Sequence, residues 1–113
     1  ASNELFVRMD IHQGHLGYHR AVHLDHTRRL ASMLIYLCDK EENKMVGGDL
    51  IMEGAKRKPW AYFKGRKVIA PKHNRMAAFP VTPNSWHSVP VVKSQTVPRN
   101  FLQVTISSPV VAW

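Results

Sequence analysis

Cysteine is almost absent from this 113-residue chain, in which Cys38 stands alone. A single cysteine excludes an internal disulfide framework and a metal cluster built from cysteines of the chain. Long apolar runs are also missing, since none approaches the roughly 20 residues that a helix needs to cross a bilayer. The N-terminus lacks the basic and then apolar pattern of a signal peptide. Together these absences predict a soluble protein of the cytoplasm.

Acidic residues are missing from the second half of the chain. All eight precede residue 54, where there are six Lys or Arg, whereas residues 54–113 contain ten Lys or Arg and no acid. Eight of the basic residues lie in the segment 56–75, together with Trp60, Tyr62 and Phe63. Such a segment attracts an acidic polypeptide, an anionic metabolite or nucleic acid. A solvated loop that keeps a small protein soluble is the alternative.

Short apolar segments separated by Gly, Pro and Asn recur along the chain. They predict strands at 5–11, 18–25, 29–37, 47–52, 68–70, 76–79, 86–89 and 99–107. Residues 29–37 are apolar enough for burial on both faces of a strand. A helix competes there, because Leu, Met and Ala favour it. The whole pattern indicates one all-β domain over residues 1–113, either a sandwich or a barrel.

The sequence His23-Leu24-Asp25 is the first candidate for chemistry. Side chains two residues apart in a strand point to the same face, so His23 and Asp25 can bind one metal ion together. A second imidazole would complete the two-histidine, one-carboxylate face that non-heme Fe(II) oxygenases use. We expect His87 to supply it. The remaining histidines are expected at the surface or behind the ligands: His12, His15, His19, His26 and His73. Of these, His12 follows the first predicted strand and can reach the cavity.

Arg99 begins the last predicted strand. Its guanidinium could hold a carboxylate through two hydrogen bonds, and few acids are available to pair with it instead. Alternation along the strand places Arg99 on the more polar face with Gln103, opposite to Leu102 and Val104. A residue that lines a wet ligand cavity is expected on that face.

The order of these motifs, with Gly47-Gly48 between them, resembles that of the Fe(II)- and 2-oxoglutarate-dependent dioxygenases. The likeness is greatest to the prolyl-hydroxylase branch and covers roughly residues 6–107. It implies a double-stranded β-helix, an eight-stranded jelly-roll barrel with the metal near its open end. It also implies Fe(II), 2-oxoglutarate and dioxygen, with ascorbate as an accessory reductant. The helices that usually buttress the larger sheet in this family have no counterpart in the chain.

The same resemblance implies a role for individual residues. Iron would be bound by His23, Asp25 and His87. Arg99 and Tyr36 would bind the distal carboxylate of 2-oxoglutarate, and Leu34 and Val89 would line its pocket.

The implied reaction is hydroxylation of a C–H bond, with succinate and CO2 as co-products. A peptidyl proline is the favoured substrate, and a free amino acid or another small molecule is the alternative. Nucleic-acid demethylation is disfavoured, because related repair enzymes carry an R-x5-R motif and no arginine follows Arg99. A cupin-type barrel that binds metal without oxygenase activity is the alternative from another class. Selectivity is expected to reside in residues 54–65 and in the turn at Tyr18, and an oligomer is left open.

Overall fold

The computed structural model describes residues 4–54 and 66–112, and its regular elements there are eight β-strands. They are β1 Phe6–Gly14, β2 Arg20–His23, β3 Arg29–Tyr36, β4 Leu50–Gly54, β5 Lys67–Ile69, β6 Met76–Pro80, β7 Trp86–Val89 and β8 Arg99–Ser107. Within these residues no helix is long and apolar enough to cross a membrane. The sequence-based prediction of an all-β fold is confirmed.

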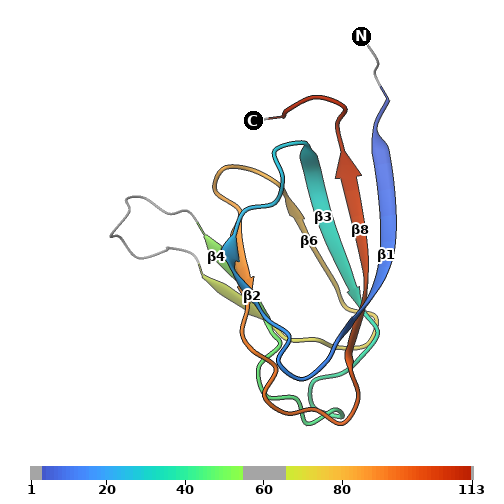
Figure 1. Ribbon diagram of the computed structural model, residues 1–113, viewed down its shortest axis with the longest axis vertical. Helices are drawn as coiled ribbons and strands as arrows, with labels where there is room; N and C mark the ends of the chain where they lie inside the picture. Colours follow the sequence, from blue (N-terminus) through green and yellow to red (C-terminus); the bar gives the residue numbers. More distant parts are fainter. Residues whose placement is uncertain (1–3, 55–65, 113) are drawn as a thin grey trace.

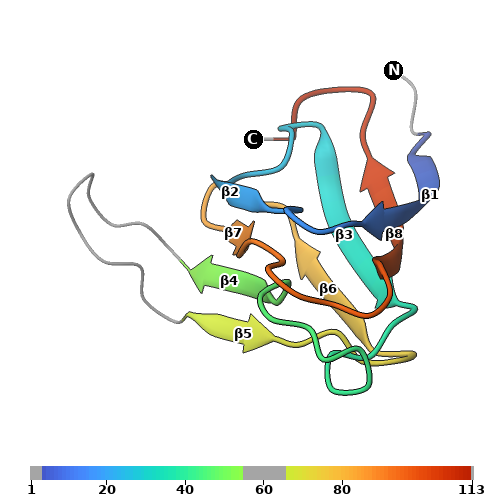
Figure 2. The same ribbon diagram turned by 60° about the horizontal axis from the view of Figure 1, so that its bottom comes forward.

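The strands form two antiparallel four-stranded sheets that face each other (Figures 1 and 2). One has the order β1-β8-β3-β6 and the other the order β2-β7-β4-β5. Most consecutive strands therefore alternate between the sheets, as they do in a jelly roll. The predicted double-stranded β-helix is the fold observed.

The core lies between the two sheets. Its buried side chains come from both of them and from the segment after β6: Leu34, Tyr36, Leu50, Ala77, Phe79, Val81, Val89 and Phe101. Burying each of the larger apolar side chains contributes roughly 1.5 to 3 kcal/mol. The inward faces of these strands therefore form a packed core that supports the polar side chains on the same faces.

The outer face of the β1 sheet carries exposed apolar side chains. On the edge strand β1, Val7 is 65%, Met9 68% and Ile11 75% exposed. On β3, buried and half-buried residues alternate. The expectation that 29–37 is buried on both faces was therefore wrong, because only the inward face has a second sheet packed against it.

Several predicted boundaries also shift. β1 continues to Gly14, β2 is confined to Arg20–His23, and β4 begins only at Leu50. Gly47 and Gly48 precede β4 with φ of 80° each, a region that favours glycine.

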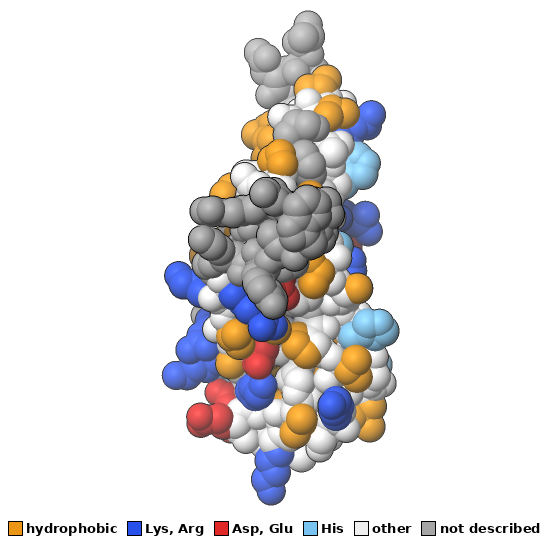
Figure 3. Space-filling model, turned by 90° about the vertical axis from the view of Figure 1, so that its left-hand side faces the viewer, with side chains coloured by type: hydrophobic (Ala, Val, Ile, Leu, Met, Phe, Trp, Pro, Cys, Tyr) orange, Lys and Arg blue, Asp and Glu red, His pale blue; other side chains and the backbone are white. Residues whose placement is uncertain are grey.

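Much of the basic segment 56–75, and of the expected selectivity loop 54–65, lies outside the described residues. At its described end, Arg66 Nε is 3.3 Å from Glu53 Oε2. Figure 3 shows Lys and Arg side chains spread among apolar ones on this face of the molecule.

Candidate active site

His23, Asp25 and His87 converge at one end of the space between the sheets. Each offers a ligand atom, and the three atoms lie within 4.8 Å of one another. His23 ends β2 and is paired in register with His87 on β7. Asp25 lies two residues beyond the end of β2, so its position is set by the turn that follows rather than by strand alternation. Its Oδ1 is 3.7 Å from His23 Nε2 and 3.4 Å from His87 Nε2.

Hydrogen bonds orient all three side chains. His23 Nδ1 lies 2.7 Å from the Ala21 carbonyl and His87 Nδ1 lies 2.9 Å from the Ser85 carbonyl. A carbonyl can only accept, so each Nδ1 carries the proton and each Nε2 keeps its lone pair. Ser32 Oγ donates to Asp25 Oδ2 at 2.6 Å, which leaves Oδ1 toward the two Nε2 atoms.

The protonation states suit a divalent cation. Burial raises the pKa of Asp25, but the adjacent His87 imidazole and the hydrogen bond from Ser32 outweigh this effect and hold that pKa well below its usual range. Burial lowers the pKa of the His23 imidazole. A metal requires deprotonated ligands, and these shifts provide a carboxylate and a neutral imidazole at neutral pH. Two imidazole nitrogens and one carboxylate oxygen form a donor set that fits Fe(II).

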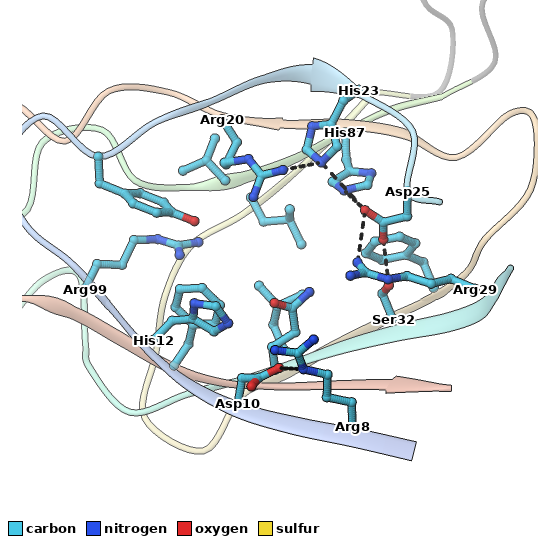
Figure 4. Close-up of a pocket in the computed structure, with 17 residues that line it drawn as sticks. Arg8, Asp10, His12, Arg20, His23, Asp25, Arg29, Ser32, His87 and Arg99 are labelled. Carbon is cyan, nitrogen blue, oxygen red and sulfur yellow. Dashed lines mark hydrogen bonds and ion pairs between the residues drawn. The ribbon is translucent and has the colours of Figure 1, made fainter. Parts of the chain in front are cut away.

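A cavity of about 290 Å³ extends from this cluster to Arg99 (Figure 4). The cavity is lined by six of the seven residues for which the sequence implied a role: His23, Asp25, His87, Arg99, Leu34 and Val89. Tyr36 does not line the cavity. Its hydroxyl lies 3.5 Å from Arg99 Nη2, and burial raises its pKa to about 12. Its contact with a co-substrate stays a prediction.

Arg99 is 0% exposed, although it carries a charge. Its Nε donates to the Gly48 carbonyl at 2.6 Å, and its buried Nη1 has no hydrogen-bond partner in the part of the chain that the structure describes. Aromatic rings surround the guanidinium, and the ring centroids of Tyr18 and Phe101 are 5.4 and 4.8 Å from its Cζ. A buried charge without a counter-ion is costly, because ring faces replace only part of the lost hydration. This end of the cavity is therefore built for an anion.

Tyr18 and His12 are among the cavity residues that received no definite role from the sequence. The ring of Tyr18 lies beside Arg99, and His12 stacks on Phe101 at 4.9 Å between ring centroids. His12 Nε2 is buried and has no hydrogen-bond partner within residues 4–54 and 66–112. Alternation carries the missing signal, because His12 shares the cavity face of Asp10 only if the first strand continues past Ile11. The other four histidines that we expected outside the ligand set are exposed: His15, His19, His26 and His73.

Comparison with known proteins yields a family and a fold. A family model described as the 2OG-Fe(II) oxygenase superfamily matches residues 6–105. The crystal structure of an RmlC-like cupin protein from Desulfovibrio desulfuricans is similar in fold, with a TM-score of 0.50 and 15% sequence identity. The similarity covers 92% of this chain and 74% of that one. No curated protein matches the chain.

Proposed function

Because the chain belongs to the 2OG-Fe(II) oxygenase superfamily, we propose that it is a hydroxylase that binds iron through His23, Asp25 and His87. The cofactors of the family are Fe(II) and 2-oxoglutarate. In this proposal Arg99 binds the distal carboxylate of 2-oxoglutarate. The first substrate to test is a peptidyl proline, and the second is a free amino acid or another small molecule.

When bound, iron and 2-oxoglutarate would supply, together with dioxygen, the hydroxylation of a substrate C–H bond, with succinate and CO2 as co-products. The chain supplies placement and charge. Ser32 fixes the Asp25 carboxylate, so one oxygen remains for the metal. The carboxylate cancels only one of the two positive charges of Fe(II), and anionic ligands still bind there. Arg99 fixes the orientation of the co-substrate from the far end of the cavity.

The buried guanidinium of Arg99 carries the proposal. A metal-binding barrel needs no fully buried arginine at the other end of its cavity, whereas a chelating dicarboxylate needs a cation for its second carboxylate. Nη1 has no hydrogen-bond partner among the described residues, and a carboxylate would accept from it. The hydroxyl of Tyr36, which accepts from Nη2, keeps its own proton for donation.

Titration of the anaerobic Fe(II) protein with 2-oxoglutarate tests the proposal. A chelated 2-oxo acid is expected to give a visible metal-to-ligand charge-transfer band, and succinate is then released in oxygen. Arg99→Ala should weaken 2-oxoglutarate binding by about 2 to 4 kcal/mol, because it removes the charged partner of a buried carboxylate. The exposed Arg28 provides the control, since Arg28→Ala removes the same charge outside the cavity.

The outcomes separate the two classes of function. Iron binding without the band, at saturating 2-oxoglutarate, would identify a metal-binding barrel of cupin type. Equal 2-oxoglutarate affinity in the Arg99 and Arg28 variants would place the carboxylate elsewhere. Succinate release with proline-containing peptides and with free amino acids then ranks the substrates.

A further inference from the structure

The positive charges that line the cavity exceed the negative ones. Among the described residues, four arginines line it, at positions 8, 20, 29 and 99, and two aspartates, at positions 10 and 25. A divalent metal and the 2-oxoglutarate dianion cancel each other, so two positive charges remain when both are bound. This count rests on the proposed function.

The contacts identify the residues that carry this excess. Arg8 Nε is 2.8 Å from Asp10 Oδ2, so this pair is neutral as a unit. Arg99 is assigned to the co-substrate. Arg20 and Arg29 remain, and Figure 4 shows both guanidiniums directed toward the metal-ligand cluster.

A bound metal competes with both guanidiniums for their present partners. Arg20 Nη2 lies 3.4 Å from His23 Nε2, whose lone pair is the one that a metal would take. Arg29 Nη1 lies 3.6 Å from Asp25 Oδ1, the oxygen free for the metal. The other carboxylates of the chain give no substitute, because none of them besides Asp10 and Asp25 lines the cavity.

We propose that the substrate carries an anionic group, a carboxylate or a phosphate, which Arg20 and Arg29 bind beside the metal. Guanidinium groups bind both anions through paired hydrogen bonds. The side chain of Arg29 is 33% exposed and Arg20 is an exposed residue, so an incoming substrate can reach both. The anionic group would then set how far from the metal the oxidised carbon lies.

Matched ligands, one with and one without an anionic group, test this inference. The protein is loaded with Mn2+ and 2-oxoglutarate without oxygen, so binding is measured by calorimetry without turnover. N-acetyl-L-proline is compared with N-acetyl-L-prolinamide, and glycerol 3-phosphate with glycerol. The anion of at least one pair should bind tenfold or more tightly than its neutral match, and the preferred pair distinguishes carboxylate from phosphate.

Variants assign the effect to residues. Arg20→Gln and Arg29→Gln should each weaken binding of the preferred anion about tenfold and leave the neutral match unchanged. Arg28→Gln, one residue from Arg29 but outside the cavity, should leave the anion affinity unchanged. The 2-oxoglutarate affinity should stay the same in all three variants.

Failure of this inference is distinguishable from failure of the proposed function. If 2-oxoglutarate binds but the anions gain nothing over their neutral matches, the substrate assignment is wrong and the oxygenase assignment stands. If Arg20→Gln and Arg29→Gln weaken 2-oxoglutarate instead of the anion, these arginines belong to the co-substrate site. If 2-oxoglutarate itself does not bind, the proposed function fails first.

Discussion

Replacement of Ser32 by alanine isolates the contribution of one hydrogen bond to the candidate metal site. Ser32 Oγ donates to Asp25 Oδ2 at 2.6 Å, and Ser32 is 1% exposed. Without this donor the carboxylate can rotate, and its pKa rises because a bond that stabilises the charged form is lost. Loss of a hydrogen bond behind a metal ligand typically reduces metal affinity 10- to 100-fold, or about 1.4 to 2.7 kcal/mol.

Ser88 provides a matched control in the same fold. Its Oγ donates to Glu53 Oε1 at 2.8 Å, and Ser88 and Glu53 are 8% and 7% exposed. Both serine variants therefore remove a buried hydrogen bond to a carboxylate, which costs about 1.5 to 3 kcal/mol of folding stability. Of the two serine hydroxyls, only that of Ser32 donates to a candidate metal ligand.

Calorimetric titration with Mn2+ measures the metal affinity, and urea unfolding of the metal-free protein measures the stability. Ser32→Ala should lose affinity at least tenfold, whereas Ser88→Ala should lose stability and keep its affinity. Equal dissociation constants for the two variants would refute the reasoning, because Asp25 would then need no support from Ser32 to bind the metal.

Three further predictions follow from the cavity and its supports. Tyr36→Phe should weaken 2-oxoglutarate binding by about 1 kcal/mol if its hydroxyl contacts the carboxylate; Tyr18→Phe, measured by the same titration, tests the competing phenol that lines the cavity. Burial raises the pKa of Tyr36 from 10.0 to about 12, so the folded protein keeps a proton that the unfolded chain releases. The free energy of unfolding should therefore fall as pH rises from 10 to about 12, by up to about 3 kcal/mol more in the wild type than in Tyr36→Phe; parallel curves in urea would contradict this. Gly47→Ala should destabilise by more than the about 1 to 2 kcal/mol expected for Gly17→Ala. Both glycines have positive φ, but a Cβ on Gly47 would lie 1.9 Å from the Val91 carbonyl oxygen, whereas space around Gly17 is open; equal unfolding midpoints would argue against the clash.

The positions of the strands were predictable because turn-forming residues separate them. Gly, Pro and Asn between short apolar segments located all eight strands, and the jelly-roll order came from the resemblance rather than from any pairing signal. The two errors concern features that depend on neighbours distant in the sequence. Residues 29–37 are apolar on both faces, and sequence alone does not show that the outer face of their sheet lacks a covering layer. The end of the first strand was missed because Gly14 is typical of a turn, although β8 pairs with both Gln13 and Gly14.

The candidate ligands were predictable from type and spacing, whereas their supports were not. His23 and Asp25 are close in sequence, and the fold brings His87 to them across 62 residues. Ser32 is an ordinary strand residue until the turn after β2 brings Asp25 onto it. Arg20 is likewise one exposed arginine among many in a basic chain. Its significance depends on its partner, because the lone pair of His23 Nε2, 3.4 Å from Arg20 Nη2, is the one that a metal would bind. The cavity offers Arg20 too few carboxylates as an alternative partner. In the proposed function, residue types thus encode the chemistry of the reaction, and the charges that remain unpaired after the cofactors bind determine the choice of substrate.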